Sequence, residues 1–294
     1  GGNIGTPVLS LKIKKNTFFI IEASSYQLSH SKFIHPDYAI LLNITNDHID
    51  WHGSMQSYTK SKLKIFNLQA KNDFALVNDK LKYIFKKNKY LSKLVPINLK
   101  SYREIKSKIK NDYLQSSAND RNMCFVFALA KLLKIKKDSF LKSMNSFIGL
   151  PHRYEVFFKK NNITLINDSK ATSFESTKFA LSSCKDIFWI VGGLPKDKDK
   201  INLKYVKKNI VKSYIIGKNI NFFKDQLKEK IKFTVSKDLK KSILSAFEDV
   251  RILKKKHSTI LLSPAAASFD QFKNFEDRGN EFKKISRLYA KKFI

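Results

Sequence analysis

Cysteine and long apolar runs are scarce in this chain of 294 residues. Its two cysteines, Cys124 and Cys184, are too few for a disulfide scaffold and indicate a reducing compartment, which in a bacterium is the cytoplasm. No run approaches the roughly 18 consecutive apolar residues of a membrane helix, and the first residues contain no basic, apolar leader. Because 43% of the residues are hydrophobic, the chain is not a disordered tail. The sequence predicts a soluble, cytoplasmic protein of one large or two ordinary domains, without a membrane partner.

Acidic residues and arginine are scarce as well. Lysine and arginine total 57 against 25 Asp and Glu, a net charge of +32 that would suit a nucleic-acid-binding protein. Only six of the 57 cations are arginine, however, and the planar guanidinium is the group that base and phosphate recognition favours. The lysines are spread through nearly every predicted helix, for example at residues 81–89 and 204–212. We therefore attribute the charge to surface composition and expect no nucleic-acid partner, although the field would attract an anionic substrate.

Strands and helices alternate along the chain, which predicts the α/β class with crossover helices. In the first half, apolar runs predict buried parallel strands at residues 17–22 and 38–44 and a third strand at 74–77, and apolar spacing predicts helices at 55–68, 119–133 and 140–147. In the second half we expect strands at 154–158, 164–166, 187–191, 213–216 and 259–262, and helices at 174–182, 222–229, 239–247 and 281–291. Gly149 and Pro151 end the helix between the two series, so the sequence predicts two domains, 1–148 and 149–294.

Glu22 closes the first predicted strand. The carboxyl ends of strands are where ligands bind in open α/β sheets, and a carboxylate there could hold Mg²⁺. An equally good interpretation is a helix N-terminus, with Ser24 or Ser25 as the cap and Glu22 near the positive end of the helix.

The loop after the second predicted strand contains Asp47, His48, Asp50 and His52. Imidazole suits zinc better than magnesium, so this cluster alone would indicate a metallohydrolase, unless it is a polar loop in which an aspartate caps a turn. Lys62, taken by itself, is one lysine among many on a solvated helix face.

Small and polar residues follow three strands of the second half. The segments are Asn167–Thr172, Gly192–Lys196 and Ser263–Ser268. Each alone reads as a turn or a helix cap, but three in one domain favour a binding edge. No G-x-x-x-x-G-K-[ST] loop, C-x-x-C pair, H-E-x-x-H helix or G-x-S-x-G turn occurs in the sequence.

These motifs together resemble the UDP-N-acetylmuramoyl-L-alanine:D-glutamate ligase family of ATP-dependent Mur ligases. The stretches that carry the resemblance, in order, are GGNIGTP at Gly1, EASSYQL at Glu22, LLNITNDHIDWHGSMQSY at Leu41, KLKIF at Lys62, GLPHRYE at Gly149, INDSKAT at Ile166 and LLSPAAASFDQFKNFEDRGNEF at Leu261. The resemblance covers residues 1–282 and implies two α/β domains. These are a truncated Mur-ligase central, ATPase-type domain lacking its P-loop at 1–148, and a Rossmann-like C-terminal, D-glutamate-binding domain at 149–294.

The resemblance also implies a reaction and its residues. ATP phosphorylates the carboxylate of UDP-N-acetylmuramoyl-L-alanine, and the amine of D-glutamate attacks the acyl phosphate. By similarity, Asn3, His48 and Lys62 would be catalytic, with Glu22, His48 and a carbamylated Lys62 as Mg²⁺ ligands and Ser24 and Gln27 on the muramoyl side. Asn119, Arg153 and Asp168 would contact ATP, and the residues expected around D-glutamate are Lys170, Thr172, Lys196, Ser268 and Phe275. A monomer is implied, with the two sets of polar groups meeting when the domains close.

The sequence departs from the family pattern in several respects, among them Ala118 before Asn119 and Ser173 and Phe174 after Thr172. The UDP-binding domain and the G-K-S/T loop expected before Gly1 are missing, so we expect this chain as given to be inactive or nearly so. Leu194 and Pro195 replace the usual acidic-glycine pair before Lys196. The alternatives are a sister Mur ligase or a folylpolyglutamate-synthase-like enzyme with another amino-acid substrate, and a basic nucleic-acid-binding protein that keeps an old ligase fold.

Overall fold

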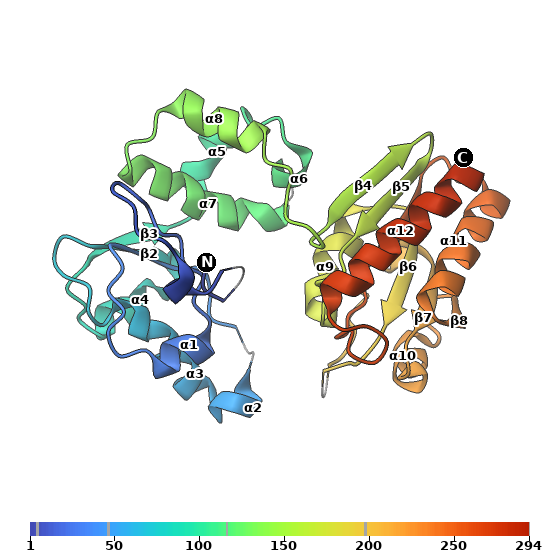
Figure 1. The fold of residues 1–294 in the computed structure, drawn as a ribbon, viewed down its shortest axis with the longest axis horizontal. Helices are drawn as coiled ribbons and strands as arrows, with labels where there is room; N and C mark the ends of the chain where they lie inside the picture. Colours follow the sequence, from blue (N-terminus) through green and yellow to red (C-terminus); the bar gives the residue numbers. More distant parts are fainter. Residues whose placement is uncertain (4–5, 46–47, 116, 197–198, 294) are drawn as a thin grey trace. The chain divides into compact units, whose positions relative to one another are not determined.

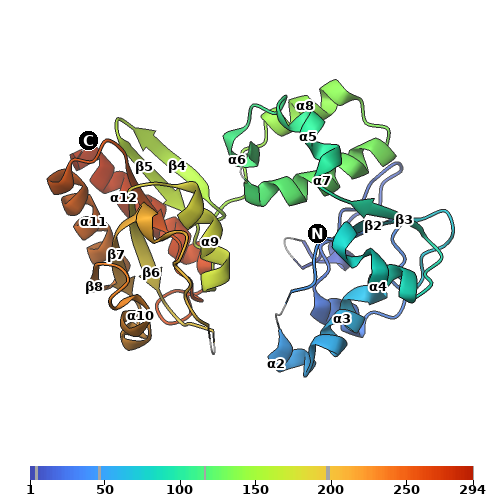
Figure 2. The same cartoon turned by 180° about the vertical axis from the view of Figure 1, so that it is seen from behind.

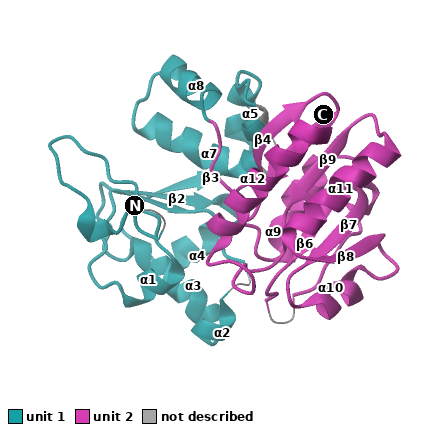
Figure 3. Cartoon of the chain, turned by 45° about the vertical axis from the view of Figure 1, so that its right-hand side comes forward, with its two compact units in different colours: residues 1–147 teal, residues 148–294 magenta. Residues whose placement is uncertain are grey.

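The structure is a computed structural model that describes residues 1–3, 6–45, 48–115, 117–196 and 199–293. It divides into two compact units, Gly1–Phe147 and Ile148–Ile294, each with its own sheet and core (Figures 1 and 3). The expected α/β class is confirmed in both units. Among the described residues, no helix combines the length and the apolar character that a membrane crossing requires.

Unit 1 is built on a three-stranded parallel sheet in the order β1-β2-β3. The strands are β1 (Tyr38–Leu41), β2 (Phe74–Asn78) and β3 (Lys93–Ile97), with Tyr38 opposite Phe74 and Phe74 opposite Lys93. Alternate residues of the central strand β2 enter different cores, because side chains alternate across a strand. Ala75 and Val77 pack with Leu63, Phe66 and Phe85 on one face. On the other face, Leu76 packs in a core with residues of α5, α7 and α8 (Figure 1).

The helices of unit 1 cover both faces of that sheet (Figures 1 and 2). In chain order the helical segments are η1 (Val8–Ser10), α1 (Ser25–His30), α2 (Ile49–His52), α3 (Met55–Leu63), η2 (Lys64–Phe66), η3 (Asp79–Leu81), α4 (Lys82–Lys87), α5 (Lys100–Lys106), α6 (Asp112–Gln115), α7 (Ser117–Leu132) and α8 (Lys137–Asn145).

The strand predicted at residues 17–22 is wrong. Phe18 and Ile20 are 77% and 83% exposed, and among the residues that the structure describes the strand-like pairing of this segment is a single bridge between Gly2 and Glu22. An apolar run is a property of one segment, whereas a buried strand also needs a partner strand hydrogen-bonded along its whole length. The prediction also missed β3, an edge strand that contains Pro96; proline is typical of edge strands.

Unit 2 contains a six-stranded sheet in the order β4-β5-β9-β6-β7-β8. The strands are β4 (Glu155–Lys160), β5 (Ile163–Asn167), β6 (Ile187–Gly192), β7 (Ile210–Ile216), β8 (Phe233–Lys237) and β9 (Ser258–Leu262). Among the described strands of this sheet, β4 alone is antiparallel to its neighbour, and the other pairings are parallel. Edge strand β8 was not predicted. The β5, β9 and β6 strands are consecutive in the sheet, so their carboxyl ends meet at one edge.

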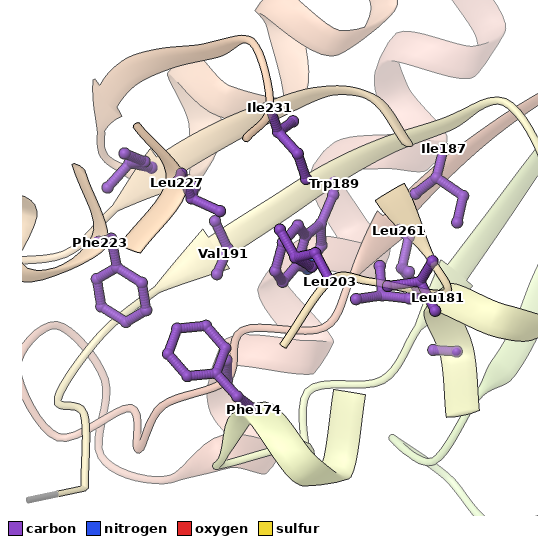
Figure 4. Packing of buried hydrophobic residues seen from close by; sticks show 14 of the residues in the cluster. Phe174, Leu181, Ile187, Trp189, Val191, Leu203, Phe223, Leu227, Ile231 and Leu261 are labelled. Carbon is purple, nitrogen blue, oxygen red and sulfur yellow. The ribbon is translucent and has the colours of Figure 1, made fainter. Parts of the chain in front are cut away.

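Helices cover both faces of this sheet (Figure 2). They are η4 (Lys207–Asn209), α9 (Phe174–Ser183), α10 (Ile220–Leu227), α11 (Leu239–Leu253) and α12 (Phe275–Phe293). Trp189 of β6 packs with residues of α9 and α10 on one face (Figure 4), and its indole Nε1 donates to the Ser263 carbonyl at 2.7 Å. The neighbouring Phe188 and Ile190 point into the second core, against α11 and α12. The buried strands fix the edge on which the polar loops sit.

Candidate functional site

Asn3 and Glu22 lie side by side in unit 1. The Asn3 amide N–H donates to the Glu22 carbonyl at 2.8 Å, and the Asn3 side-chain Nδ2 donates to Glu22 Oε1 at 3.1 Å. The Glu22 side chain is at the surface. The short pairing of the two segments therefore holds an exposed carboxylate in a defined orientation.

Ser24 and Gln27 form the cap of α1. The Ser24 Oγ accepts a hydrogen bond from the Gln27 amide at 3.2 Å, and Gln27 Oε1 accepts one from the Ser24 amide at 2.9 Å. This reciprocal capping box satisfies two N–H groups at the start of the helix. The helix-cap interpretation is thus confirmed for Ser24, and the contact of Ser24 and Gln27 with a muramoyl group stays a prediction.

His48 belongs to a group of aromatic side chains around Tyr26 and Tyr58. Its Nδ1 is hydrogen-bonded to the Tyr26 hydroxyl at 2.9 Å, and its ring centroid lies 6.5 Å from that of Tyr58. His52 lies buried in the same group, with Nε2 3.0 Å from the Ser25 hydroxyl. Burial, assisted by the charge of His48, lowers the pKa of His52. Burial thus favours the neutral form of His52, which is packed among these rings. Asp47 lies outside the described residues.

Lys62 approaches the same group from α3. Its Nζ donates to the Asn43 carbonyl at 3.1 Å and lies 5.0 Å from the centroid of the Tyr58 ring. Tyr58 thus brings His48 and Lys62 into one neighbourhood. Within the described ranges, no three or more His, Cys, Asp and Glu side chains form a group that could hold a metal ion, so nothing described supports a zinc cluster in this loop.

In unit 2 the three predicted strand-end loops are bonded to one another. Asp168, directly after β5, accepts at Oδ2 from the Ser263 hydroxyl (2.6 Å), which follows β9, and at Oδ1 from the Tyr154 amide (3.0 Å). The loops after β6 and β9 pair through Leu194 and Ala267, whose amides each donate to the other's carbonyl at 2.9 Å. The edge is therefore a connected surface rather than three separate turns.

Asp168 is 8% exposed. Burial raises its pKa to about 7, although the bonds from Ser263 and Tyr154 and the charge of Arg153 favour the ionised form. Arg153 itself is exposed. Because both Asp168 oxygens are occupied within unit 2, this carboxyl group joins β5, β9 and the segment before β4.

The residues expected around D-glutamate are borne by these loops and by the start of α12. Lys170 Nζ lies 5.0 Å from the centroid of the Phe275 ring, so these two predicted residues are in contact. Ser268 is buried, Thr172 is half-buried and Lys196 is exposed. Asn119, predicted to contact ATP, lies in α7 of unit 1, where its Nδ2 donates to the Tyr113 carbonyl at 2.7 Å.

Two groups of residues at this edge escaped the sequence reasoning. One is Arg278, which is fully buried and hydrogen-bonded to the loops after β5 and β9. Arginine is rare among the many lysines of this chain, and that rarity could have drawn attention to Arg278. The other is a hydrogen-bonded group that joins β5, β4 and α12. Asn167 Nδ2 donates to Glu155 Oε2 at 2.9 Å, and Lys283 Nζ donates to Glu155 Oε1 at 2.8 Å.

Comparison with known proteins places this arrangement in context. The family described as Mur ligase middle domain matches residues 2–141. A UDP-N-acetylmuramoylalanine–D-glutamate ligase of Rickettsia bellii is 33% identical over 311 residues, covering 98% of this chain and 68% of the relative. The enzyme of the same name from Pseudothermotoga lettingae is 29% identical and covers 100% of this chain and 70% of the relative.

Solved structures share the fold at low sequence identity. MurF ligase from Thermotoga maritima in complex with ADP has a TM-score of 0.64 at 14% identity, over 92% of this chain and 67% of that one. A MurF structure from Acinetobacter baumannii has a TM-score of 0.66 at 11% identity, over 91% and 64% of the two chains. The chain thus spans about two thirds of the length of these relatives.

Proposed function

Because this chain belongs to the UDP-N-acetylmuramoylalanine–D-glutamate ligase family, we propose that it serves the ATP-dependent addition of D-glutamate to UDP-N-acetylmuramoyl-L-alanine. The observation that carries the proposal is the connected edge of unit 2, where the loops after β5, β6 and β9 are bonded to one another. We place the reaction in the cytoplasm, in peptidoglycan precursor synthesis, since the free cysteines suit a reducing compartment. We also propose that the protein acts as a monomer.

The chemistry of that edge suits a dicarboxylic amino acid. Lys170 and Lys196 are ammonium groups, which attract carboxylates, and Thr172 and Ser268 add hydroxyl donors. Lys170 lies against Phe275, which limits the positions that its ammonium group can take. We assign these side chains to the two carboxylates of D-glutamate, with Phe275 packing against its methylene groups.

For ATP, we propose Arg153 and Asn119 as contacts and a supporting role for Asp168. Arg153 is an exposed cation beside the buried Asp168. Since both Asp168 oxygens already accept hydrogen bonds, we expect Asp168 to act by fixing the backbone next to Arg153, through Tyr154.

For Mg²⁺, the described residues offer one exposed carboxylate, Glu22, as a candidate ligand. Mg²⁺ in phosphate-transferring enzymes is held by one or two carboxylates together with phosphate oxygens, and Glu22 is an exposed carboxylate with one oxygen fixed by Asn3. We propose Glu22 as this ligand, with His48 and a carbamylated Lys62 as further ligands. When bound, ATP would supply the phosphoryl group that activates the muramoyl carboxylate, and Mg²⁺ would neutralise the charge on the phosphate oxygens.

Thermal unfolding of the 294-residue chain tests the amino-acid assignment. A ligand that binds only the folded state raises the melting temperature, so D-glutamate should raise it and L-glutamate, L-lysine and diaminopimelate should not. Lys170→Met should abolish the effect of D-glutamate. The matched control is Lys204→Met, since Lys204 also lies over a ring, that of Tyr205, in unit 2. Equal protection by L-lysine or diaminopimelate would identify a sister ligase instead.

A further inference from the structure

Arg278 of α12 is a buried cation that holds two loops together. It is 1% exposed, and its Nε donates to the Ser169 hydroxyl at 3.0 Å. Its Nη2 donates to the carbonyls of Ser169 and Ala266 at 2.8 and 3.0 Å. One guanidinium therefore joins the loop after β5 to the loop after β9, and burying it is tolerable because these acceptors replace water.

The same network reaches the other two segments of the candidate site. The Ser169 hydroxyl donates to the Phe275 carbonyl at 2.8 Å, at the start of α12. Nη1, which finds no acceptor among the residues described, abuts Gly193 of the loop after β6, where a Cβ atom would lie 3.2 Å from it. All four segments that bear the candidate D-glutamate residues thus touch Arg278 or its partner Ser169.

We propose that Arg278 is a positioning residue for the D-glutamate site, acting through the loops that carry Lys170, Lys196 and Ser268. The inference rests on the proposed function. Arginine suits this task because its planar fork presents several N–H donors in fixed directions to separate acceptors. Lysine presents its three N–H donors from a single nitrogen, so it would not reproduce the separate Nε and Nη2 bonds that Arg278 makes to the two loops. Small displacements of binding groups are costly at a preorganised site.

Calorimetric titration of D-glutamate into the 294-residue chain tests this role. We expect Arg278→Lys to raise the Kd for D-glutamate by about tenfold or more, and hydrogen exchange to become faster at the Leu194 and Ala267 amides, which join the loops. Arg287→Met is the matched control, because Arg287 is an exposed arginine of the same helix that lies over the Phe157 ring.

A second control separates positioning from general destabilisation. Val250→Ala removes buried volume from α11, in the core on the α11/α12 face of the sheet, and should lower stability while leaving the Kd unchanged. If Arg278→Lys does not fold, Ser169→Ala removes one hydroxyl of the same network and should also weaken binding. Wild-type affinity in the folded variants would overturn the inference and leave the proposed function standing. Failure of the wild-type chain to bind D-glutamate would overturn both.

Discussion

Substituting Asp168 by Asn tests whether one buried carboxyl group makes unit 2 less stable as the pH rises. Burial raises the pKa of Asp168 to about 7 from 3.8. Asparagine keeps the shape and can keep both bonds, since its oxygen can accept from the Tyr154 amide and its NH₂ group can donate to the Ser263 oxygen. The substitution therefore removes the titrating proton with little change in packing.

The magnitude follows from the two pKa values. The folded state holds the proton more tightly than the unfolded state, so the wild-type protein loses stability as the pH rises from about 4 to about 7 and loses no more above that range. The difference between 3.8 and about 7 corresponds to about 4 kcal/mol. The free energy of unfolding of Asp168→Asn, relative to wild type, should therefore rise by about 4 kcal/mol across this range.

Urea unfolding followed by tryptophan fluorescence measures this quantity. The chain has two tryptophans, so a Trp51→Phe background leaves Trp189, which is buried in unit 2, as the reporter. Asp238→Asn is the control for removing one negative charge, since Asp238 caps α11 and Asn caps helices equally well. A stability difference that stays constant between pH 4 and 8, or that falls as the pH rises, would refute the reasoning.

Three further predictions concern a close backbone approach, a cap and the surface charge. Gly193→Ala should lower the free energy of unfolding by at least about 3 kcal/mol, because φ is +134° and the new Cβ would lie 2.4 Å from the Ala267 carbonyl oxygen. The control is Gly53→Ala, whose new Cβ would have no heavy atom within 4 Å. It should lower the free energy of unfolding by about 1 kcal/mol in the same denaturation assay. Ser24→Ala should cost about 1 kcal/mol and speed hydrogen exchange at the amides that open α1. Titration with a DNA duplex at two salt concentrations should show no salt-dependent binding. A DNA-binding protein would lose about 0.9 in log K per phosphate contact for each tenfold rise in salt, and such a slope would favour a nucleic-acid function.

The sequence by itself determined the class of fold and most of its elements. Apolar runs at β1, β2, β5, β6, β7 and β9 and the apolar spacing of the main helices are local properties, so they could be read without knowing any neighbour. The motifs after β5, β6 and β9 also indicated a binding edge, because polar and small residues after parallel strands point to a shared edge of the sheet.

Tertiary structure decided which apolar segments become strands and what role a capping or binding residue takes. The apolar run around Phe18 and Ile20 is exposed, and within the described ranges its strand-like pairing is limited to the bridge between Glu22 and Gly2. By contrast, β3 and β8, whose own patterns are weak, form at sheet edges. Ser24 or Ser25 could cap the helix that follows Glu22, and only the folded α1 shows that Ser24 is the cap.

The candidate site shows the same division. Sequence motifs supplied Lys170, Lys196 and Ser268, but only the folded chain shows that Asp168 is buried between two loops and that Arg278 joins them. Burial and hydrogen bonding depend on segments about 100 residues apart in the chain. Local sequence fixes what each segment can form, and contacts between distant segments fix the pKa values and the orientations on which the chemistry depends.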